Sequence, residues 1–375
     1  MTMTLRHLFQ ASAALKSGRC TERLTPRVAL ALARQCGFSL IELMIALVLA
    51  GILLFGLAVF FVSSSRSYSE AERVSRQIEN GRYAMALIAE EIRHAGFYGQ
   101  VGNVTLLPTV PAPSSQIPMP GALPDPCATA IASVKAALPI PIQGVDNVAV
   151  ATSPSCVTDA VAGTDILVIR RANTTTVAAG AAVANGYYTQ SANCATAAPI
   201  FQIAQSGFTL QDKDCATVMP IRQYHVYIYY VAPCSIATGV NGACQAGDAP
   251  LPTLKRVELL PTGMSAPVPL VEGIENVQYE YGLDTSGDGS PDTYTAAPAT
   301  VTQWAQVVAV RVHVLARNVD TTAGFTDTKT YSMGLNADNS ANTVTPGGSF
   351  RRHAYTDLAR VTNVSQRIEP TLGTP

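Results

Sequence analysis

The hydrophobic residues of this chain form one long, almost unbroken run, then a stripe at helical spacing, then several segments in which apolar and polar residues alternate. The run covers residues 38–62, twenty-five positions with a single charged residue, Glu42. Such a length is enough to span a bilayer as an α-helix. A carboxylate inside the bilayer costs on the order of 2.5–3.5 kcal/mol on insertion scales. The pattern therefore predicts a membrane helix and leaves Glu42 to be explained.

Small and apolar residues continue at helical spacing beyond this run. They alternate three and four positions apart, at Ala71, Val74, Ile78, Gly81, Met85, Ile88, Ile92 and Ala95. A stripe of this kind buries one face of a helix against a partner. The pattern predicts one helix of about 55 residues, roughly 80 Å long at the α-helical rise, that ends near Gly96. Gly81 inside it costs about 1 kcal/mol relative to alanine.

The rest of the chain predicts a β-rich domain. Residues 107–126 hold seven prolines, which indicates an irregular loop. Strand-like segments follow at 165–172, 221–232, 254–260, 271–283, 304–319 and 350–361. Two of these segments alternate cleanly: Tyr224, Val226, Ile228 and Tyr230 share one face, as do Val308, Val310, Val312 and Val314. Short spacings and polar turns favour an antiparallel sheet.

The cysteines lie mostly on one side of the apolar run. Of eight, six follow it: Cys127, Cys156, Cys194, Cys215, Cys234 and Cys244. An even set on one side of a membrane segment predicts up to three disulfides in an oxidising compartment. Sequential pairing is favoured, because the last two close a short loop. A metal site is the alternative, but neither a C-x-x-C pair nor a nearby histidine spacing supports it.

The residues around the apolar run bear on its topology. Six basic residues and one acid, Glu22, precede the run, so the positive-inside bias predicts a cytoplasmic N-terminus and an exported C-terminal domain. A secretory signal peptide would need a shorter run and a small-x-small cleavage site. A lipoprotein would use Cys36, but "ARQC" lacks the aliphatic residue expected three positions earlier. A plain signal anchor explains the length of the run but not Glu42.

The stretch "GFSLIEL" at 37–43 resembles the type IV prepilin signature. This resemblance implies that a prepilin peptidase at the cytoplasmic face cleaves between Gly37 and Phe38 and N-methylates Phe38. The apolar segment then stays on the product as an anchor. Glu42 would pair with the amino terminus of a neighbouring subunit when helices bundle, which offsets the cost of burying its charge.

The same resemblance implies a division of the chain and a fold. The parts are a leader (1–37), the transmembrane half of a spine helix (38–62), its distal half (63–96) and a β-rich head (97–375). A leader of 37 residues is longer than is usual for prepilins. Two explanations stay open: a start codon assigned too early, because a start at Val28 gives a ten-residue basic leader, or a genuinely long leader. The implied fold is α+β, a long spine helix packed on an antiparallel head with disulfide-stapled loops.

Longer blocks toward both ends of the chain resemble PilW-type minor pilins. They are "RSYSEAERVSRQIENGRYAMALIAEEIRHAGFYG", "GIENVQYEYGLDTSGDGSPDTY", "WAQVVAVRVHVLARN" and "FRRHAYTDLARVTN", whereas 100–270 matches only loosely. This resemblance implies a low-abundance subunit that helps to initiate the pilus filament at or near its tip, with other major and minor pilins as partners. It implies a single-pass protein of the bacterial inner membrane with a periplasmic head, later on the surface pilus, with roles in twitching motility and adhesion.

Two alternative functions stay open. A pseudopilin of type II secretion shares the signature and the helix. A tip adhesin or DNA-uptake subunit would use 100–270 as its binding surface. The composition, 14% charged with a net charge of −1, gives no steering toward a polyanion, so no sequence-specific nucleic acid is expected.

The segment "DTSGDGSPD" spaces its oxygen donors like the first nine positions of a calcium loop. The donors are Asp284, Ser286, Asp288, the Ser290 carbonyl and Asp292, with Gly289 at the sharp turn. The acid expected at the twelfth position is missing, because Thr295 stands there. The alternative is a solvated turn between two strands. Calcium is the one cofactor that the sequence predicts, and none is required.

Signals of catalysis are weak. The five histidines show no metal-binding spacing, and there is no G-x-S-x-G elbow or phosphate-binding glycine loop. His225 and His313 lie within predicted strands, which favours structural imidazoles. We therefore expect a protein that is not an enzyme.

Overall fold

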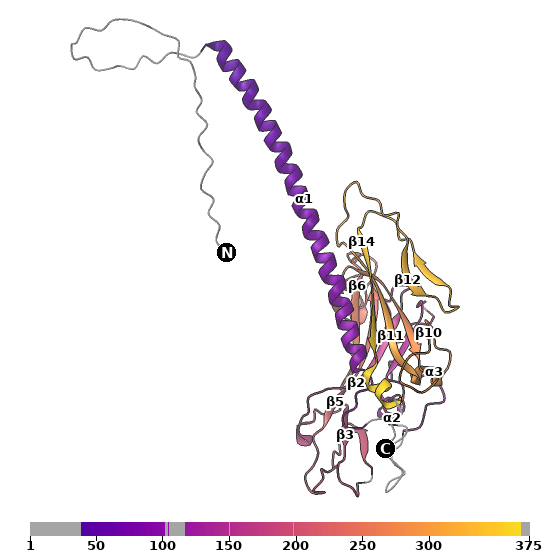
Figure 1. Cartoon of the computed structure of the whole chain (residues 1–375). Helices are drawn as coiled ribbons and strands as arrows, with labels where there is room; N and C mark the ends of the chain where they lie inside the picture. The colour runs from indigo at the N-terminus through magenta and orange to yellow at the C-terminus, as the bar shows by residue number, and fades with distance from the viewer. Residues whose placement is uncertain (1–38, 102–103, 105–116, 150, 198, 369–375) are drawn as a thin grey trace, which may run out of the picture. The chain divides into compact units, whose positions relative to one another are not determined.

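The computed structural model describes residues 39–101, 104, 117–149, 151–197 and 199–368 (Figure 1). The chain separates into two compact units, Met1–Ser63 and Ser64–Pro375, and each is described by itself. The predicted leader, with Gly37 and Phe38, lies outside the described residues, as does the first half of the proline-rich loop, 107–116.

Helix α1 spans Leu40–His94, 55 residues, which confirms the predicted length. Among the described residues it is the one helix long and apolar enough to cross a membrane: its most apolar 18-residue window has a mean hydropathy of 3.0, and none of that window is buried. The helix ends as predicted near Gly96, which has a φ of +74° and donates its N–H to the Arg170 carbonyl at 2.9 Å. Glycine adopts that φ without strain.

The buried face of α1 lies within the second unit. Its buried residues are Gln77, Gly81, Ala84, Met85, Ile88, Ala89 and Ile92. The predicted stripe is therefore right from Gly81 onward but wrong at Ala71 and Ile78, which are exposed. The reason is Gln77, which is buried because its amide donates to the Ala316 carbonyl at 2.9 Å. A hydrogen-bonded amide can be buried at little cost, and a hydrophobic pattern does not reveal it.

The larger sheet of the head has eight strands, and every pairing is antiparallel. Its main path is β1-β2-β5-β3-β4, and β6 joins it by pairing with β5, β7 and β8. The bounds are β1 Ile142–Val145, β2 Ile166–Ala172, β3 Tyr188–Ser191, β4 Phe201–Ala204, β5 Arg222–Ala232, β6 Thr253–Leu260, β7 Gly263–Met264 and β8 Val268–Glu272.

The smaller sheet has four antiparallel strands in the order β10-β9-β11-β14. The bounds are β9 Ile274–Leu283, β10 Thr293–Thr295, β11 Val307–Arg317 and β14 Arg352–Arg360. Strands β12 (Tyr331–Leu335) and β13 (Ala341–Val344) form a separate hairpin. The short helices are α2 Ile131–Ala136, α3 Val301–Ala305 and α4 Thr362–Ile368, with 3-10 turns at Ala179–Ala181 and Val240–Gly242.

All six predicted segments contain strands, but two have different bounds. The segment 271–283 is interrupted at Gly273, whose φ is +76°, so it supplies the end of β8 and the whole of β9. The segment 304–319 begins with the end of helix α3, not with a strand. A capping box between Thr300 and Gln303 starts that helix and places Trp304 in it.

The core consists of two clusters on opposite faces of β5. One cluster joins Ile88 and Ile92 of α1 to Tyr229 of β5 and Val312 of β11. The other covers the face of β5 that carries Tyr224, Val226, Ile228 and Tyr230. Both predicted strand faces are confirmed. Burying each large apolar side chain contributes roughly 1.5–3 kcal/mol, so α1 is packed on the head by its aliphatic face.

The six cysteines of the head form three disulfides, as predicted. They are Cys127–Cys156, Cys194–Cys215 and Cys234–Cys244, which is the sequential pairing that the sequence favours. Each typically contributes about 2–4 kcal/mol by restricting the unfolded chain. The long apolar helix, the antiparallel head and the disulfides together give the expected α+β fold.

Candidate functional site

Glu42 lies in the first turn of α1, within the first unit. The apolar side chains beside it, Ile41 and Leu43, are 67% and 55% exposed. Its carboxylate forms no ion pair with the other described residues. A charge inside an apolar helix surface is costly in a membrane unless it is paired. The described residues supply no such pair for Glu42.

Polar contacts fasten the distal half of α1 to the head within the second unit. Glu91 accepts two hydrogen bonds from the guanidinium of Arg171, at 2.7 and 3.0 Å, and both side chains are largely buried. Asn80 donates its amide to the Glu272 carbonyl at 3.0 Å. Hydrogen bonds from two positions on the helix, one of them a buried two-bond ion pair, fix the rotation of the helix about its axis. They therefore determine which face of α1 is left exposed.

Gly81 of α1 lies close against Tyr355 of β14. A Cβ built on Gly81 would lie 2.2 Å from Cε2 of Tyr355 and 2.8 Å from Cζ. The Tyr355 ring thus occupies the space that any other residue would need, which explains a glycine in the middle of a helix. The Tyr355 hydroxyl is buried without a hydrogen-bond partner among the described residues, and burial raises the pKa of Tyr355.

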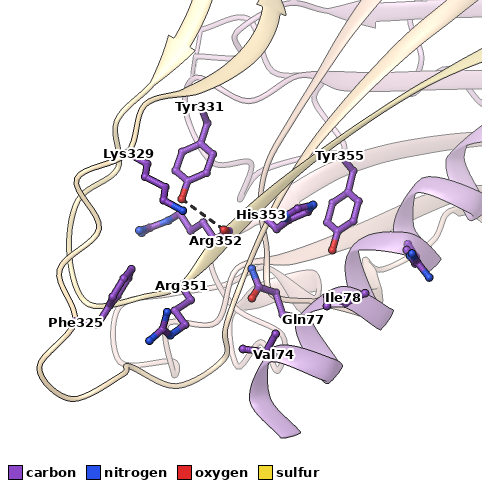
Figure 2. Close-up of a pocket in the computed structure, with 11 residues that line it drawn as sticks. Val74, Gln77, Ile78, Phe325, Lys329, Tyr331, Arg351, Arg352, His353 and Tyr355 are labelled. Atoms are coloured by element: carbon purple, nitrogen blue, oxygen red, sulfur yellow. Dashed lines mark hydrogen bonds between the residues drawn. The ribbon is translucent and has the colours of Figure 1, made fainter. Parts of the chain in front are cut away.

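Beside this contact lies a groove, which we call the α1–β14 groove (Figure 2). It has a volume of about 440 Å³ and lies between the distal half of α1 and the segment 325–355. It is lined by Val74, Gln77, Ile78, Arg82, Phe325, Lys329, Tyr331, Arg351, Arg352, His353 and Tyr355. Its walls are thus aromatic and aliphatic, with basic side chains among them.

Two of the basic side chains of the groove lie close to carboxylates. Arg352 pairs with Asp327 at 2.9 Å and with Glu275. Arg351 lies 3.7 Å from Glu70 and over the ring of Phe325, 4.5 Å from its centroid.

The two remaining cations of the groove stand on opposite walls. Arg82 comes from α1 and Lys329 from the loop before β12. Both are exposed, and neither forms an ion pair with another described residue. The groove therefore carries an excess of positive charge.

The predicted calcium loop is bonded internally. Asp284 is 2% exposed, and its carboxylate accepts N–H bonds from Gly287 at 2.6 Å and Gly289 at 2.8 Å. The Asp292 carboxylate accepts from the Thr285 N–H at 2.7 Å and from its hydroxyl at 2.8 Å. These bonds, the side-chain bond first, lower the pKa of Asp292. The loop thus forms a closed turn from its own donors.

Asp284 and Asp292 each accept from the Ser286 hydroxyl at 3.3 Å, but the three carboxylates of the loop do not bring their oxygens within 4.8 Å of one another. The guanidinium of Arg360 donates to the Gly289 carbonyl at 3.3 Å, which places a positive charge against the loop. Among the described residues, one group brings three metal-ligating atoms within 4.8 Å of one another, Cys234, Cys244 and Asp248, and its two cysteines are bonded to each other. Calcium binding by 284–292 stays a prediction.

The two strand histidines are held in structural surroundings. His313 contacts the Thr356 hydroxyl at 2.9 Å and Glu280 at 3.1 Å. His225 is 6% exposed, and its Nδ1 lies 3.8 Å from Glu258. Burial, with the charge of Arg171 added, lowers the pKa of His225 to about 4. Both rings are therefore fixed within sheets, away from the groove.

The groove and its contacts were not predicted from the sequence. Lys329 and Arg351 are brought against α1 by the fold, and their spacing along the chain gives no sign of it. Gly81 was the one available signal, because a glycine within a strong helical pattern indicates a close approach. A buried ion pair was missed as well: Lys255 lies 3.3 Å from Asp159, and both are almost fully buried.

An apolar helix of membrane-spanning length, an antiparallel head and disulfides define a pilin-like α+β protein. Comparison with known families agrees with this class. Residues 228–363 match the family model of the type IV pilus-assembly protein W, PilW, and residues 32–58 match the prokaryotic N-terminal methylation motif. These two matches support a type IV pilus protein of the minor pilin type. No curated protein and no solved structure matches it.

These matches also bear on the other predictions. The apolar helix and the prepilin motif support anchoring in a membrane. The motif implies processing by the prepilin peptidase, and the family implies contact with other pilus components. The pilus-assembly family is structural, which is consistent with a protein that is not an enzyme. The PilW match covers the smaller sheet and all of the groove lining contributed by the head.

Proposed function

We propose that this protein is a minor pilin that takes part in initiating the type IV pilus filament, at or near its tip. It acts by bundling its spine helix with those of other major and minor pilins. The observation that carries the proposal is the coincidence of the PilW match at 228–363 with an unpaired Glu42 in the apolar half of α1. The PilW match also favours the pilus over type II secretion.

Assembly on this proposal begins with processing at the cytoplasmic face of the inner membrane. The peptidase cleaves between Gly37 and Phe38 and methylates the new amino terminus, and the head lies in the periplasm. The match to the methylation motif at 32–58 supports this step. The product keeps its apolar helix, so it waits in the membrane until it joins the filament at the cell surface.

Glu42 then selects and places the neighbouring helix. A carboxylate in hydrocarbon favours a positive partner within a few ångströms, because the low dielectric strengthens their attraction. The methylated amino terminus of an adjacent subunit supplies that charge. Pairing offsets the burial cost of Glu42 and fixes the axial stagger between two helices, which is what an initiating complex needs.

The experiment compares Glu42→Gln with Glu72→Gln, a matched change at an exposed position of the same helix. Glu42→Gln should insert stably and be processed, yet leave few surface pili when expressed in cells that lack the native chain. Glu72→Gln should leave pilus numbers much closer to normal. Normal piliation by Glu42→Gln would overturn the proposed role.

A second comparison separates assembly from surface binding. Cells expressing a chain without 100–270 should lose surface pili if the head is needed to initiate the filament. Normal piliation with lost adhesion would instead support the tip-adhesin alternative, with 100–270 as the binding surface.

A further inference from the structure

We propose that the α1–β14 groove binds an acidic segment of a neighbouring pilin subunit. The proposal rests on the proposed function, because it takes the neighbour to be another pilin. It adds a second contact between subunits, in the head-proximal part of α1 rather than in the apolar part that carries Glu42.

The charge of the groove selects the chemistry of its occupant. Arg82 and Lys329 have no ion-pair partner among the described residues, whereas Arg352 is tied to two carboxylates. Two unpaired cations on opposite walls attract carboxylates, and a charge-assisted hydrogen bond is about twice as strong as a neutral one. The groove is therefore suited to an acidic ligand.

The walls of the groove favour a peptide over an inorganic anion. Phe325, Tyr331 and Tyr355 present aromatic surface, and Val74 and Ile78 present aliphatic surface. A volume of about 440 Å³ takes a few side chains, so apolar groups of the occupant can be buried between its carboxylates. A small ion such as sulfate would leave this apolar surface uncovered.

Nucleic acid fits the groove less well. A nucleic-acid site usually follows the phosphate backbone with a row of basic side chains. Here the groove offers two cations without an ion-pair partner among the described residues, Arg82 and Lys329, rather than a row, and the whole chain has a net charge of −1. The observations thus favour an acidic peptide, and nucleic acid becomes an outcome of the test.

A neighbouring spine helix can supply such a segment. One wall of the groove is α1 itself at residues 74–82, and α1 is the element that bundles in the proposed function. Helix α1 also carries exposed carboxylates at Glu79 and Glu90. A subunit built on the same plan would therefore bring carboxylates to the level of Arg82 and Lys329.

The test measures binding of a defined acidic helix to the full chain in detergent micelles. The probe is the peptide EALAEALAEALA-amide with fluorescein on its N-terminal amine, and its matched control has the same label and glutamine in place of each glutamate. We expect saturable binding of the acidic peptide, at least about tenfold tighter than that of the glutamine peptide. Failure of the acidic peptide to bind at millimolar concentration would overturn the proposal, as would equal binding of both peptides.

Variants locate the binding in the groove. Lys329→Glu and Arg82→Glu, on opposite walls, should each weaken binding of the acidic peptide about tenfold. Lys213→Glu, an exposed lysine in another loop of the head, should leave it unchanged. Equal loss in all three variants would show attraction by overall charge and would overturn the assignment. Tighter binding of a twelve-nucleotide single strand, lost in the same two variants, would assign the groove to nucleic acid instead.

Failure of this inference can be told apart from failure of the proposed function. The peptide measurement needs no filament, whereas the Glu42→Gln measurement counts pili. An acidic peptide that does not bind, together with pilus loss in Glu42→Gln, would remove the groove proposal alone. A peptide that binds, together with normal piliation in Glu42→Gln, would remove the role of Glu42 and leave the groove as a peptide site.

Discussion

Gly81→Ala should lower the stability of the native chain, which has tyrosine at position 355, but raise the stability of a chain with alanine there. Alanine is favoured over glycine inside a helix by about 1 kcal/mol. The added Cβ, however, would lie 2.2 Å from the Tyr355 ring, and overpacking of this kind typically costs about 1–3 kcal/mol. Taking about 2 kcal/mol for the displaced ring, Gly81→Ala should lower the free energy of unfolding by about 1 kcal/mol.

Removing the ring removes this penalty. In a Tyr355→Ala background, Gly81→Ala should raise the free energy of unfolding by about 1 kcal/mol, because only the helix preference remains. The double-mutant cycle should therefore give a coupling of about 2 kcal/mol between residues 81 and 355. Ala86→Gly, at an exposed position of the same helix, measures the helix preference by itself.

Trp304 provides the assay. It is the single tryptophan of the chain, is 3% exposed and lies 4.6 Å from the Tyr281 ring, centroid to centroid. Its fluorescence during denaturant unfolding of the full chain in micelles follows the core cluster that α1 shares with both sheets. An equal effect of Gly81→Ala in both backgrounds would refute the close approach of α1 to Tyr355.

Three further outcomes are expected. Mass spectrometry of the mature chain should find N-methyl-Phe38 as its first residue, and a bulky residue in place of Gly37 should leave unprocessed precursor in the membrane. Because the pKa of His225 is about 4 in the folded protein and about 6.5 when unfolded, its contribution to stability is present above pH 6.5 and is lost as the pH falls through 4. Between pH 7 and pH 4.5 the native chain should therefore lose about 2 kcal/mol more than His225→Phe does. If 284–292 binds calcium, millimolar Ca²⁺ should raise the melting temperature, and Asp288→Ala should abolish that rise.

Each of these three outcomes can fail in a distinct way. A first residue other than Phe38 would refute the cleavage site. Parallel pH profiles for the native chain and His225→Phe would show that protonation of this imidazole is not linked to unfolding. The absence of heat in a calorimetric titration with calcium, together with an unchanged melting temperature, would leave 284–292 as the internally bonded turn that the structure shows.

The elements predicted best from the sequence are those whose own pattern determines them. The length of α1 follows from its apolar run and its distal stripe, and the strand faces of β5 and β11 follow from period-two alternation. The predictions were wrong where a polar side chain forms a local hydrogen bond that a hydrophobic pattern does not reveal. On α1, Gln77 rather than Ile78 lies on the buried face, because its amide donates to the Ala316 carbonyl. At the start of the predicted strand 304–319, the capping box at Thr300 begins helix α3 instead.

The groove could not be predicted because it is a product of tertiary packing. Residues 74–82 and 325–355 are far apart in the chain, and neither has a composition that indicates binding. The prepilin residues lie at the opposite extreme: Gly37, Phe38 and Glu42 are contiguous, so a short motif was enough to suggest them. The loop at 284–292 is an internally bonded turn in the structure, and calcium binding there stays a prediction.

The placement of the disulfides has a consequence for how this head can vary. All three lie within residues 127–244, and the strands of the smaller sheet contain no cysteine. A cross-link holds the ends of a loop together whatever residues lie between them, and lengthening such a loop costs little entropy. Exposed positions between Cys194 and Cys215, such as Ser206 and Thr209, can therefore accept substitutions or an insertion without disturbing the packing of β11 and β14 on the spine, whereas Phe201 and Ile203 of β4 are held in the core. The surface loops of the head can vary while the strands that pack on α1 stay constant.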